Sequence, residues 1–404
     1  MVSKGKIDKE YAVAVVGGGA AGLMAALELI RGENAFSPAD VVLLEKNDRV
    51  GKKILATGNG QCNLSNENVS EKFYHGNKNL IQGFLQNFTK INLIKYFENI
   101  GIYSESDAAG RIYPVSRQAS AFLDQIRAHI LSASPEIMTD FNVSEIKYEQ
   151  GAFTVSAKNL SVRAENVIFA CGGKAGEGFG TDGTAYSLLE KFSHKTGALY
   201  PSLVKIKTER EKIKGLKNLK ERAKVSVYDG KTELAEFTGD VLFTDYGVSG
   251  NAVFSSSAYI GNAEFPSVKI EFLPEFSTEE LTSILDARKN MPFISECGAF
   301  VGLINKKIGY AIEKTAKSAN PCDLAYAAKN FTLKVEGTAG FSAAQTTKGG
   351  FSSAIDNLTY ESLNRRGLYI VGEALDVDGD CGGYNLTFAF ITGIAAAKAI
   401  KHKK

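Results

Sequence analysis

Two apolar runs, separated by a glycine-rich turn and a helical pattern, open the chain. Residues 11–16 form a continuous β-rich apolar run, and after three consecutive glycines the apolar residues of 20–30 recur at helical spacing. A second apolar run at 41–44 ends in Glu45. This pattern predicts a strand, a tight turn, a helix and a parallel strand, which together make the βαβ unit of an α/β protein.

The same domain is expected to contain more helices and strands. Apolar residues at helical spacing predict helices over 79–99, ending near Gly101, and over 118–131. Short apolar runs at 167–170 and 367–371 predict further buried strands of the same sheet.

The pattern changes between these two strands. Residues 201–273 contain short alternating segments separated by turn residues, which predict a β-rich second domain. Residues 277–328 are helical in pattern, with a capping sequence at 277–280 and a long helix expected at 301–317. Residues 331–347 return to a strand pattern.

Composition places the chain among ordinary folded proteins. With 404 residues, 44% of them hydrophobic and 23% charged, the chain is long enough for two or three domains and is not of a disordered type. The 47 basic and 45 acidic residues nearly balance, so no global field attracts nucleic acid or membrane. The longest apolar stretch, 386–400, is broken by Gly393 and is shorter than the roughly 20 residues of a membrane span.

The cysteines and the start of the chain indicate a reducing compartment. Five cysteines are an odd number and show no C-x-x-C spacing, which disfavours a disulfide framework and a zinc site. The charged residues 1–6 precede an apolar run that is too short for a secretory signal. We therefore expect a cytoplasmic protein without a metal site or a membrane span.

The sharpest chemical signal is the G-x-G-x-x-G sequence at 17–22, which lies between the first strand and its helix. Gly17 permits the tight turn, Gly19 lets the backbone approach a pyrophosphate, and Gly22 allows close helix packing. Glu45, at the end of the second strand, is placed to accept hydrogen bonds from ribose hydroxyls. The sequence predicts a dinucleotide site, without choosing between NAD and FAD.

Two further glycine-rich segments favour FAD. Residues 51–63 combine glycines with small polar side chains, which suits close backbone approach to an extended cofactor. Residues 372–386 lead into a helix starting near Asn385. The positive end of that helix dipole would favour the anionic reduced flavin ring.

Several segments together resemble one known family. They are 17–23, 51–63, 110–116, 170–173, 242–250 and 372–386. In order and composition they resemble the BaiN-like family of NAD(P)/FAD-dependent oxidoreductases, also known as aminoacetone-oxidase-like flavoproteins, over nearly the whole chain.

The resemblance implies an α/β fold with a discontinuous Rossmann-like FAD-binding domain, an inserted β-barrel-like domain and a small helical domain. Applied to the pattern above, it gives the FAD domain residues 1–198 and 350–404. The β-rich substrate domain is expected at 199–274 and 331–349, and the helical insert at 275–330.

The resemblance also assigns residues to the parts of the cofactor. Gly17, Gly19, Gly22 and Glu45 would hold the ADP half of FAD, Lys53 and 57–63 its middle, and Glu373, Gly383 and Asn385 its ribityl chain and ring. The full set of expected contacts is Gly17, Gly19, Ala20, Ala21, Gly22, Glu45, Lys46, Lys53, Thr57, Gly58, Asn59, Gly60, Cys62, Asn63, Val143, Cys171, Gly172, Gly173, Gly372, Glu373, Asp376, Gly382, Gly383, Tyr384, Asn385 and Leu386.

Two positions depart from the family pattern. Gln61 stands where many members carry a basic residue, and 346–350 is a variant of a Thr-Ala-Gly-Gly stretch. These departures affect the expected substrate contacts and leave the expectation of FAD unchanged.

Three residues are candidates for catalysis. Arg111 and Tyr113, in a glycine-led turn, could orient an anionic or carbonyl substrate and deliver a proton, although a surface ion pair accounts equally well for Arg111. Tyr246 is a similar candidate with packing as its alternative. Only four histidines occur, and the simplest role for His194 is to cap the C-terminus of a helix.

Other features favour structural roles. Cys62 and Cys381 lie in two cofactor segments, but the cysteine spacing of disulfide-reducing flavoenzymes is absent, so buried packing is favoured over redox pairing. Nine basic residues at 205–224 are interspersed with glutamates and lack interleaved aromatics, which favours a solvated face over a nucleic-acid site. No second G-x-G-x-x-G follows another predicted strand, so a nicotinamide is expected to bind transiently.

Three hypotheses for function follow. The first is an NAD(P)H-dependent reductase in which FAD passes a hydride to an activated C=C bond; the family resemblance favours a steroid-like or other small enone as substrate. The second is an oxidase that returns electrons to oxygen and produces peroxide. The third is a flavin-bearing RNA-modifying or RNA-binding protein that uses residues 205–224. Substrate, nicotinamide preference and oligomeric state are left open.

Overall fold

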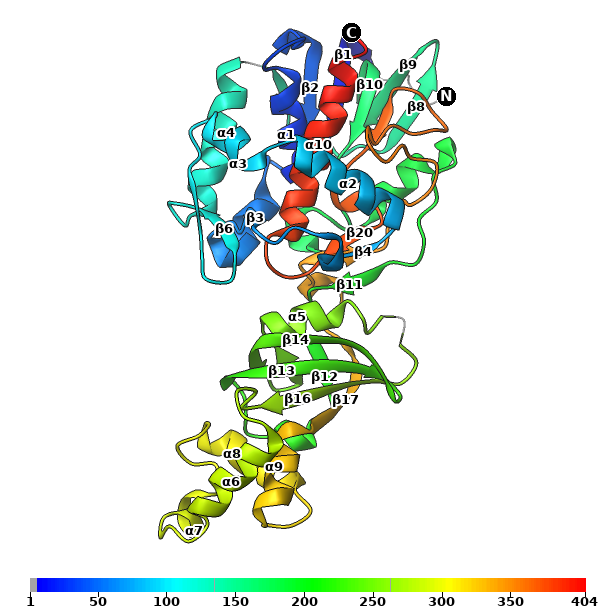
Figure 1. Cartoon of the computed structure of the whole chain (residues 1–404). Helices are drawn as coiled ribbons and strands as arrows, with labels where there is room; N and C mark the ends of the chain where they lie inside the picture. Colours follow the sequence, from blue (N-terminus) through cyan, green and yellow to red (C-terminus); the bar gives the residue numbers. More distant parts are fainter. Residues whose placement is uncertain (1–5, 134, 262) are drawn as a thin grey trace. The chain divides into compact units, whose positions relative to one another are not determined.

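The computed structural model describes residues 6–133, 135–261 and 263–404, and residues 1–5, the start of the segment considered for a signal, lie outside it. The chain divides into two compact units, Met1–Leu199 with Thr346–Lys404, and Tyr200–Gln345 (Figure 1). The predicted fold class is confirmed, because the first unit holds a mainly parallel sheet with helices and the second a closed barrel with helices.

A sheet with β1 (Lys6–Val16) near its centre forms the core of the first unit. β2 (Val41–Leu44) and β10 (Leu160–Phe169) pair with it in parallel, in a register that places Val16 beside Leu44 and Phe169. Beyond them, β7 (Glu136–Met138) and β19 (Leu368–Ile370) are also parallel, whereas β9 (Ala152–Ala157) and β8 (Glu145–Glu149) are antiparallel. The apolar runs form these strands because both faces of the sheet are covered.

Two helices pack closely together in the core of this unit. α1 (Ala20–Leu29) follows the glycine turn, and α10 (Tyr384–Lys401), red in Figure 1, lies beside it. A side chain at Gly393 would bring its first carbon within 2.2 Å of the Ala21 carbonyl oxygen, so glycine permits this contact. α10 is apolar on most of its surface because it is buried in the core.

The single helix expected over 79–99 is wrong. The structure contains α2 (Lys78–Lys90) and α3 (Leu93–Glu98), separated at Asn92, whose side chain accepts a hydrogen bond from Lys95 N. A side chain that caps a new first turn competes with continuation of the preceding helix. The other predicted helix is present as α4 (Ala119–Ala133).

Short strands complete the first unit. Three of them form a small sheet in which the middle strand is antiparallel to both neighbours, and two others form a ribbon. They are β3 (Ser65–Asn66), β6 (Arg111–Pro114) and β5 (Ser104–Ser106) in the sheet, β4 (Tyr74–Gly76) and β20 (Val377–Gly379) in the ribbon, and β18 (Thr346–Lys348).

The second unit is a closed barrel of six antiparallel strands with helices that share its apolar core. Around the barrel the strands are β12 (Ile206–Thr208), β15 (Gly247–Ser249), β14 (Thr232–Phe243), β13 (Lys220–Asp229), β16 (Pro266–Phe272) and β17 (Phe331–Thr338). The unit also contains β11 (Tyr200–Ser202), α5 (Asn251–Ser257), α6 (Thr278–Arg288), α7 (Ile294–Cys297), α8 (Lys306–Thr315) and α9 (Pro321–Lys329).

In the helical part of this unit, the capping residues predict where the helices begin better than the spacing of apolar residues does. α6 begins at the predicted capping box, where Ser277 and Glu280 hydrogen-bond to each other's backbone amides. The helix expected at 301–317 is shorter and begins only at Lys306, because Asn305 provides the cap and Gly302 has a φ of +78°. The strand expected at 331–347 ends at Thr338.

Candidate functional site

The predicted glycine-rich segments of the first unit lie at one edge of its sheet. β2, β1, β10 and β19 run parallel, so their carboxyl ends meet at the same edge. That edge carries Glu45 after β2, Gly17 after β1, 170–173 after β10 and Gly372 after β19. Open α/β sheets bind ligands at this edge.

The glycine turn at this edge needs glycine for two different reasons. Gly17 has a φ of +104°, and a side chain at Gly22 would lie 1.9 Å from the Gly17 carbonyl oxygen. These two glycines allow the turn and the close approach of α1. Gly19 is different, because a side chain there would meet nothing within 4 Å. The space in front of Gly19 and the first amides of α1 is therefore available to an anionic ligand.

Glu45 is held in place beside the turn. One carboxylate oxygen accepts a hydrogen bond from Gly18 N at 2.8 Å, and the other accepts from the backbone and side-chain nitrogens of Asn47 at 2.8 and 2.7 Å. The oxygen that accepts from Gly18 N keeps a second lone pair, whereas the other oxygen already accepts two hydrogen bonds. Glu45 can therefore still accept a hydrogen bond from a hydroxyl of a bound ribose.

Lys53 and Glu373 form an ion pair between the second and third glycine segments. Lys53 Nζ lies 2.7 Å from Glu373 Oε2 and donates to the Ala175 carbonyl at 2.9 Å. The other carboxylate oxygen accepts from Thr347 N at 2.9 Å. Both side chains are about three-quarters buried, so the pair fixes segments that lie 320 residues apart in sequence.

The loop after Lys53 has an unusual backbone. Residues 58–60 and Cys62 all have positive φ, and Cys62 at +59° is neither glycine nor asparagine. Such left-handed residues cluster at functional sites. The side-chain amide of Asn63 lies between Gly383 N, from which it accepts at 3.1 Å, and the Ser65 carbonyl, to which it donates at 3.1 Å.

The third glycine segment is fixed by its own side chains. Both ends of the Asn385 amide bond to Gly379, accepting from N at 2.9 Å and donating to O at 2.7 Å. Gly383 has a φ of +97° and lies directly against the Ser65 carbonyl. The predicted α-helix is present and begins at Tyr384, so its first amides lie at the end of this loop.

The remaining predicted contacts take several positions in the first unit. Lys46 forms an ion pair with Asp182 at 2.7 Å, and Thr57 Oγ1 donates to the Ile54 carbonyl at 2.6 Å. Gly173 leaves no room for a side chain beside Thr347 and Glu373. Ala20 and Ala21 begin α1, Cys171 and Gly172 follow β10, Leu386 lies in the first turn of α10, Gly382 precedes that helix, and Val143 lies in the segment before β8. Burial raises the pKa of Asp376.

Two candidate catalytic residues lie on β6 of the first unit. The Arg111 side chain pairs with Asp107, with its Nε and a terminal nitrogen 2.8 and 2.7 Å from the same carboxylate oxygen. Tyr113 is buried, and the Arg117 guanidinium lies 4.4 Å from its ring centre. Burial raises the pKa of Tyr113, so its hydroxyl stays protonated at neutral pH. Tyr246 belongs to the second unit, in the turn between β14 and β15.

The thiols and His194 are structural in character. No disulfide joins any of the five cysteines, all of which lie within the described residues. Burial raises the pKa of Cys62 to about 12 and that of Cys381 to about 11, so neither forms the reactive thiolate at neutral pH. The His194 ring bonds to Ser362 Oγ at 2.7 Å and packs on Phe351, so the side chain does not cap the preceding helix as expected, although the backbone amide of His194 donates to the Leu189 carbonyl at 3.3 Å.

Sequence reasoning missed a buried pair that joins β4 to the third glycine segment. His75 Nε2 lies 2.9 Å from Asp380 Oδ1, and both side chains are mostly buried. β4 and β20 pair antiparallel with His75 opposite Asp378, two residues before Asp380. The signal available in the sequence was the acidic run at 376–380, but its histidine partner lies 305 residues away.

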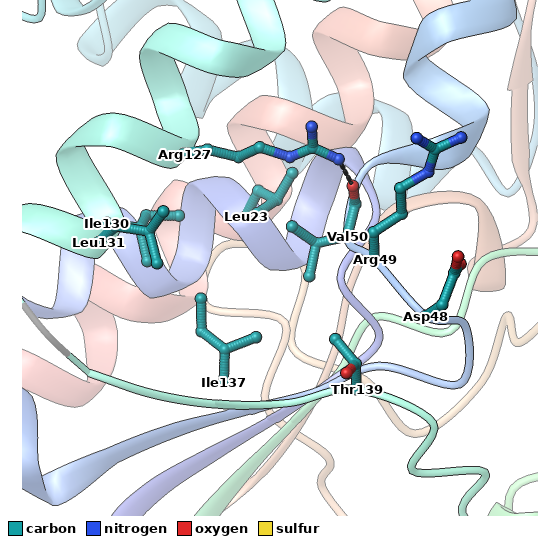
Figure 2. Close-up of a pocket in the computed structure, with 9 residues that line it drawn as sticks. All are labelled: Leu23, Asp48, Arg49, Val50, Arg127, Ile130, Leu131, Ile137 and Thr139. Carbon is teal, nitrogen blue, oxygen red and sulfur yellow. Dashed lines mark hydrogen bonds between the residues drawn. The ribbon is translucent and has the colours of Figure 1, made fainter.

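A separate pocket lies apart from the predicted contacts. It has a volume of about 190 Å³ and lies between α1, α4 and β7. Figure 2 shows Arg127 reaching across it to the Val50 carbonyl, with Ile130, Leu131 and Ile137 around its apolar part. The pocket is smaller than the roughly 300 Å³ of typical small-molecule sites, and no predicted contact lines it.

The geometry at the sheet edge fits an extended dinucleotide. It offers an open space at Gly19 with helix amides for a pyrophosphate, a fixed carboxylate for a ribose, and a second helix N-terminus at Tyr384. In the part of the chain that the structure describes, no cluster of three or more His, Cys, Asp or Glu is arranged to hold a metal ion.

A family model describes nearly the whole chain. Residues 11–399 match the HI0933-like protein Rossmann domain. The chain belongs to the HI0933-like family. This family binds FAD and consists of flavin-dependent oxidoreductases, which confirms the resemblance drawn from the glycine-rich segments. The arrangement of glycines, Glu45 and helix N-termini at the sheet edge fits that cofactor.

Curated relatives match at full length. The chain is 33% identical to a 3-dehydro-bile acid delta(4,6)-reductase of Clostridium scindens, over 96% of this chain and 98% of the relative. It is 27% identical to a ribosomal RNA dihydrouridine synthase of Haemophilus influenzae, again over 96% and 98%.

A solved structure shares the fold. A 3-ketosteroid-delta4-(5alpha)-dehydrogenase of Rhodococcus jostii matches with a TM-score of 0.53 and 14% identity, over 99% of this chain and 98% of that one. Within the described residues, no helix combines the length and the apolar character needed to cross a bilayer.

Proposed function

We propose that this flavin-dependent oxidoreductase uses NAD(P)H to reduce a C=C bond conjugated to a carbonyl group in a small enone. The observation that carries the proposal is the convergence of three glycine-rich segments on one sheet edge, in a chain 33% identical to a reductase named for such double bonds.

The residues at the edge supply binding and orientation. The first amides of α1 and the open face of Gly19 hold the pyrophosphate, and Glu45 holds a ribose. The Lys53–Glu373 pair and the loop at 57–63 would hold the middle of the cofactor. Bound FAD supplies hydride transfer.

Reduction of a conjugated C=C bond also needs a proton and a group that polarises the carbonyl. Tyr113, with its raised pKa, keeps its proton at neutral pH and is the proposed donor. The Asp107 carboxylate fixes Arg111 and raises the pKa of its guanidinium, so it stays positive and can attract an enone oxygen. Tyr246, which belongs to the second unit, stays a candidate from its sequence alone.

NAD(P)H is proposed to bind transiently. Within the described residues, only one G-x-G-x-x-G turn joins a strand directly to an α-helix, and FAD is assigned to that turn. A nicotinamide that delivers its hydride and leaves does not need a second unit of this kind.

An anaerobic experiment tests the proposal. The flavin absorbance is bleached with NADH or NADPH, and then 3-oxo-4-ene steroids, quinones or oxygen are added separately. We expect rapid reoxidation by the enone and slow reoxidation by oxygen. Tyr113→Phe should slow reoxidation by the enone about 10²- to 10⁴-fold without slowing bleaching. Fast peroxide formation with no response to enones would instead identify an oxidase.

Uridine in RNA is a second candidate substrate, because a full-length relative is named a ribosomal RNA dihydrouridine synthase. Its reduction is also addition of hydrogen to a C=C bond conjugated to a carbonyl. Against it, four of the nine basic residues at 205–224 pair with carboxylates: Lys212, Lys217, Lys220 and Lys224. RNA binding that weakens steeply with salt, together with reoxidation by RNA alone, would favour this candidate.

A further inference from the structure

A loop that follows β10 reaches across the sheet edge to the residues after β2. We call residues 174–184 the strap. β1 lies between β10 and β2 in the sheet. The strap must therefore pass across the carboxyl end of β1, where the glycine turn and the open space at Gly19 are.

The near end of the strap is fixed beside β10. The backbone amides of Lys174 and Ala175 donate to Thr347 Oγ1 at 2.7 and 2.9 Å. The Ala175 carbonyl accepts from Lys53 Nζ at 2.9 Å. This end is thereby joined to the ion pair between Lys53 and Glu373.

The middle and far end are fixed to the residues that follow Glu45. Asn47 Nδ2, which also donates to Glu45, donates to the Phe179 carbonyl at 3.0 Å. Lys46 Nζ lies 2.7 Å from Asp182 Oδ2, while Asp182 Oδ1 accepts from Thr184 N at 3.0 Å. Both members of the ion pair are about one-third exposed, so it can open without unfolding the core.

The backbone conformation of the strap depends on glycine. Gly180 has a φ of +94°, and a side chain there would lie 2.6 Å from Asn47 Nδ2. Residues 178–183 also repeat the spacing G-x-G-x-x-G, here without a preceding strand or a following α-helix. Backbone of this kind can approach a phosphate or a ribose closely.

We propose that the strap closes over the ADP half of the bound cofactor and that the Lys46–Asp182 pair is its latch. The strap is tied to residues on both sides of the glycine turn, so a dinucleotide lying in front of Gly19 is enclosed between turn and strap. The cofactor can leave only when the strap opens. This inference rests on the proposed FAD site and adds residues 174–184 to it.

Dissociation of FAD from the holoprotein tests the latch. The holoprotein is mixed with excess 5-deaza-FAD, and release of FAD is followed by its absorbance. Asp182→Asn keeps the shape of the side chain and removes its charge, and should raise the dissociation rate about two- to fivefold. The difference from the wild type should shrink at about 1 M salt, where the Debye length is about 3 Å.

Two further variants separate the latch from general effects. Gly180→Ala should raise the dissociation rate without a change of charge, because it displaces the strap from Asn47. Glu98→Gln removes the ion pair with Lys95 on α3, whose carboxylate is about as exposed as that of Asp182, and should leave the rate unchanged. Thermal unfolding of each apoprotein shows whether the variant is folded.

Wild-type rates in both strap variants would overturn the proposal, as would an equal increase in Glu98→Gln. A wild-type protein that retains no FAD would overturn the FAD site as well. That outcome is recognised from the missing flavin absorbance before any rate is measured.

Discussion

Gly22 and Gly19 lie three residues apart in the same turn, yet the addition of one methyl group is predicted to destabilise the apoprotein at Gly22 and not at Gly19. In Gly22→Ala the new carbon would lie 1.9 Å from the Gly17 carbonyl oxygen and 3.3 Å from the Ala170 side chain. The first neighbour is backbone, which cannot rotate away. α1 must therefore move from the turn.

The cost can be estimated from packing. Overpacking costs about 1–3 kcal/mol, and an overlap with backbone belongs at or above the upper end. The higher helix propensity of alanine offsets about 1 kcal/mol. We expect a net loss of about 2 kcal/mol, which lowers the melting temperature of the apoprotein by roughly 4–8 °C.

Gly19→Ala should leave the apoprotein intact. Gly19 has a φ of −81°, which alanine adopts, and its new methyl group would meet no protein atom within 4 Å. The methyl group would instead occupy the space assigned to the pyrophosphate. We expect an unchanged melting temperature and at least a tenfold weaker affinity for FAD.

The assay pairs thermal unfolding of the apoprotein with titration by FAD, followed by quenching of flavin fluorescence. Gly22→Ala should lose stability and affinity together, whereas Gly19→Ala should lose affinity alone. Wild-type affinity in Gly19→Ala would refute the placement of the cofactor at this turn. Wild-type stability in Gly22→Ala would refute the packing argument.

Three further predictions concern buried groups. Lys53→Met leaves Glu373 Oε2 and the Ala175 carbonyl without their cation, so it should lower the stability of the apoprotein by about 1–3 kcal/mol. Lys52→Met loses a more exposed partner and should change the stability by less than about 1 kcal/mol. Equal melting temperatures of the two variants would contradict this prediction. Iodoacetamide at pH 8 should alkylate exposed Cys322 first and Cys62 only after unfolding, as read by peptide mass spectrometry, and early labelling of Cys62 would count against its burial. Burial lowers the pKa of His194, so the unfolded chain binds the proton more tightly, and the stability present above about pH 6.5 should be lost as pH falls through the pKa of the folded state. In His194→Gln the melting temperature should therefore fall less between pH 7 and pH 5 than in the wild type. An unchanged dependence of the melting temperature on pH would contradict this prediction.

The strands and the first helix could be predicted from the sequence because local pattern and tertiary packing agree there. Apart from the partly buried Ala12, residues 11–16 and 41–44 are buried on both faces of the sheet, which is what a continuous apolar run indicates. The predicted bounds of the helices at 79–99 and 301–317 were wrong, because in each an asparagine caps a new first turn while the apolar spacing continues. Periodicity reports which face is buried, and it does not report where hydrogen bonding is interrupted.

The site was predictable to the extent that it depends on glycine and on the ends of strands. Gly17, Gly22 and Glu45 could be placed because each follows a predicted strand or turn. The ion pairs Lys53–Glu373 and Lys46–Asp182 could not, since their members lie 320 and 136 residues apart and meet only in the folded sheet. The segments around these residues contain no pattern that indicates which opposite charge each one will meet.

Titration of the purified apoprotein with FAD tests the central claim most directly. We predict saturation at one FAD per chain, a bound flavin spectrum that survives gel filtration, and competition by ADP, which shares the half of the cofactor assigned to Gly19 and Glu45. A protein that stays colourless after incubation with excess FAD and removal of the unbound fraction would contradict the cofactor site, the proposed reaction and the strap together.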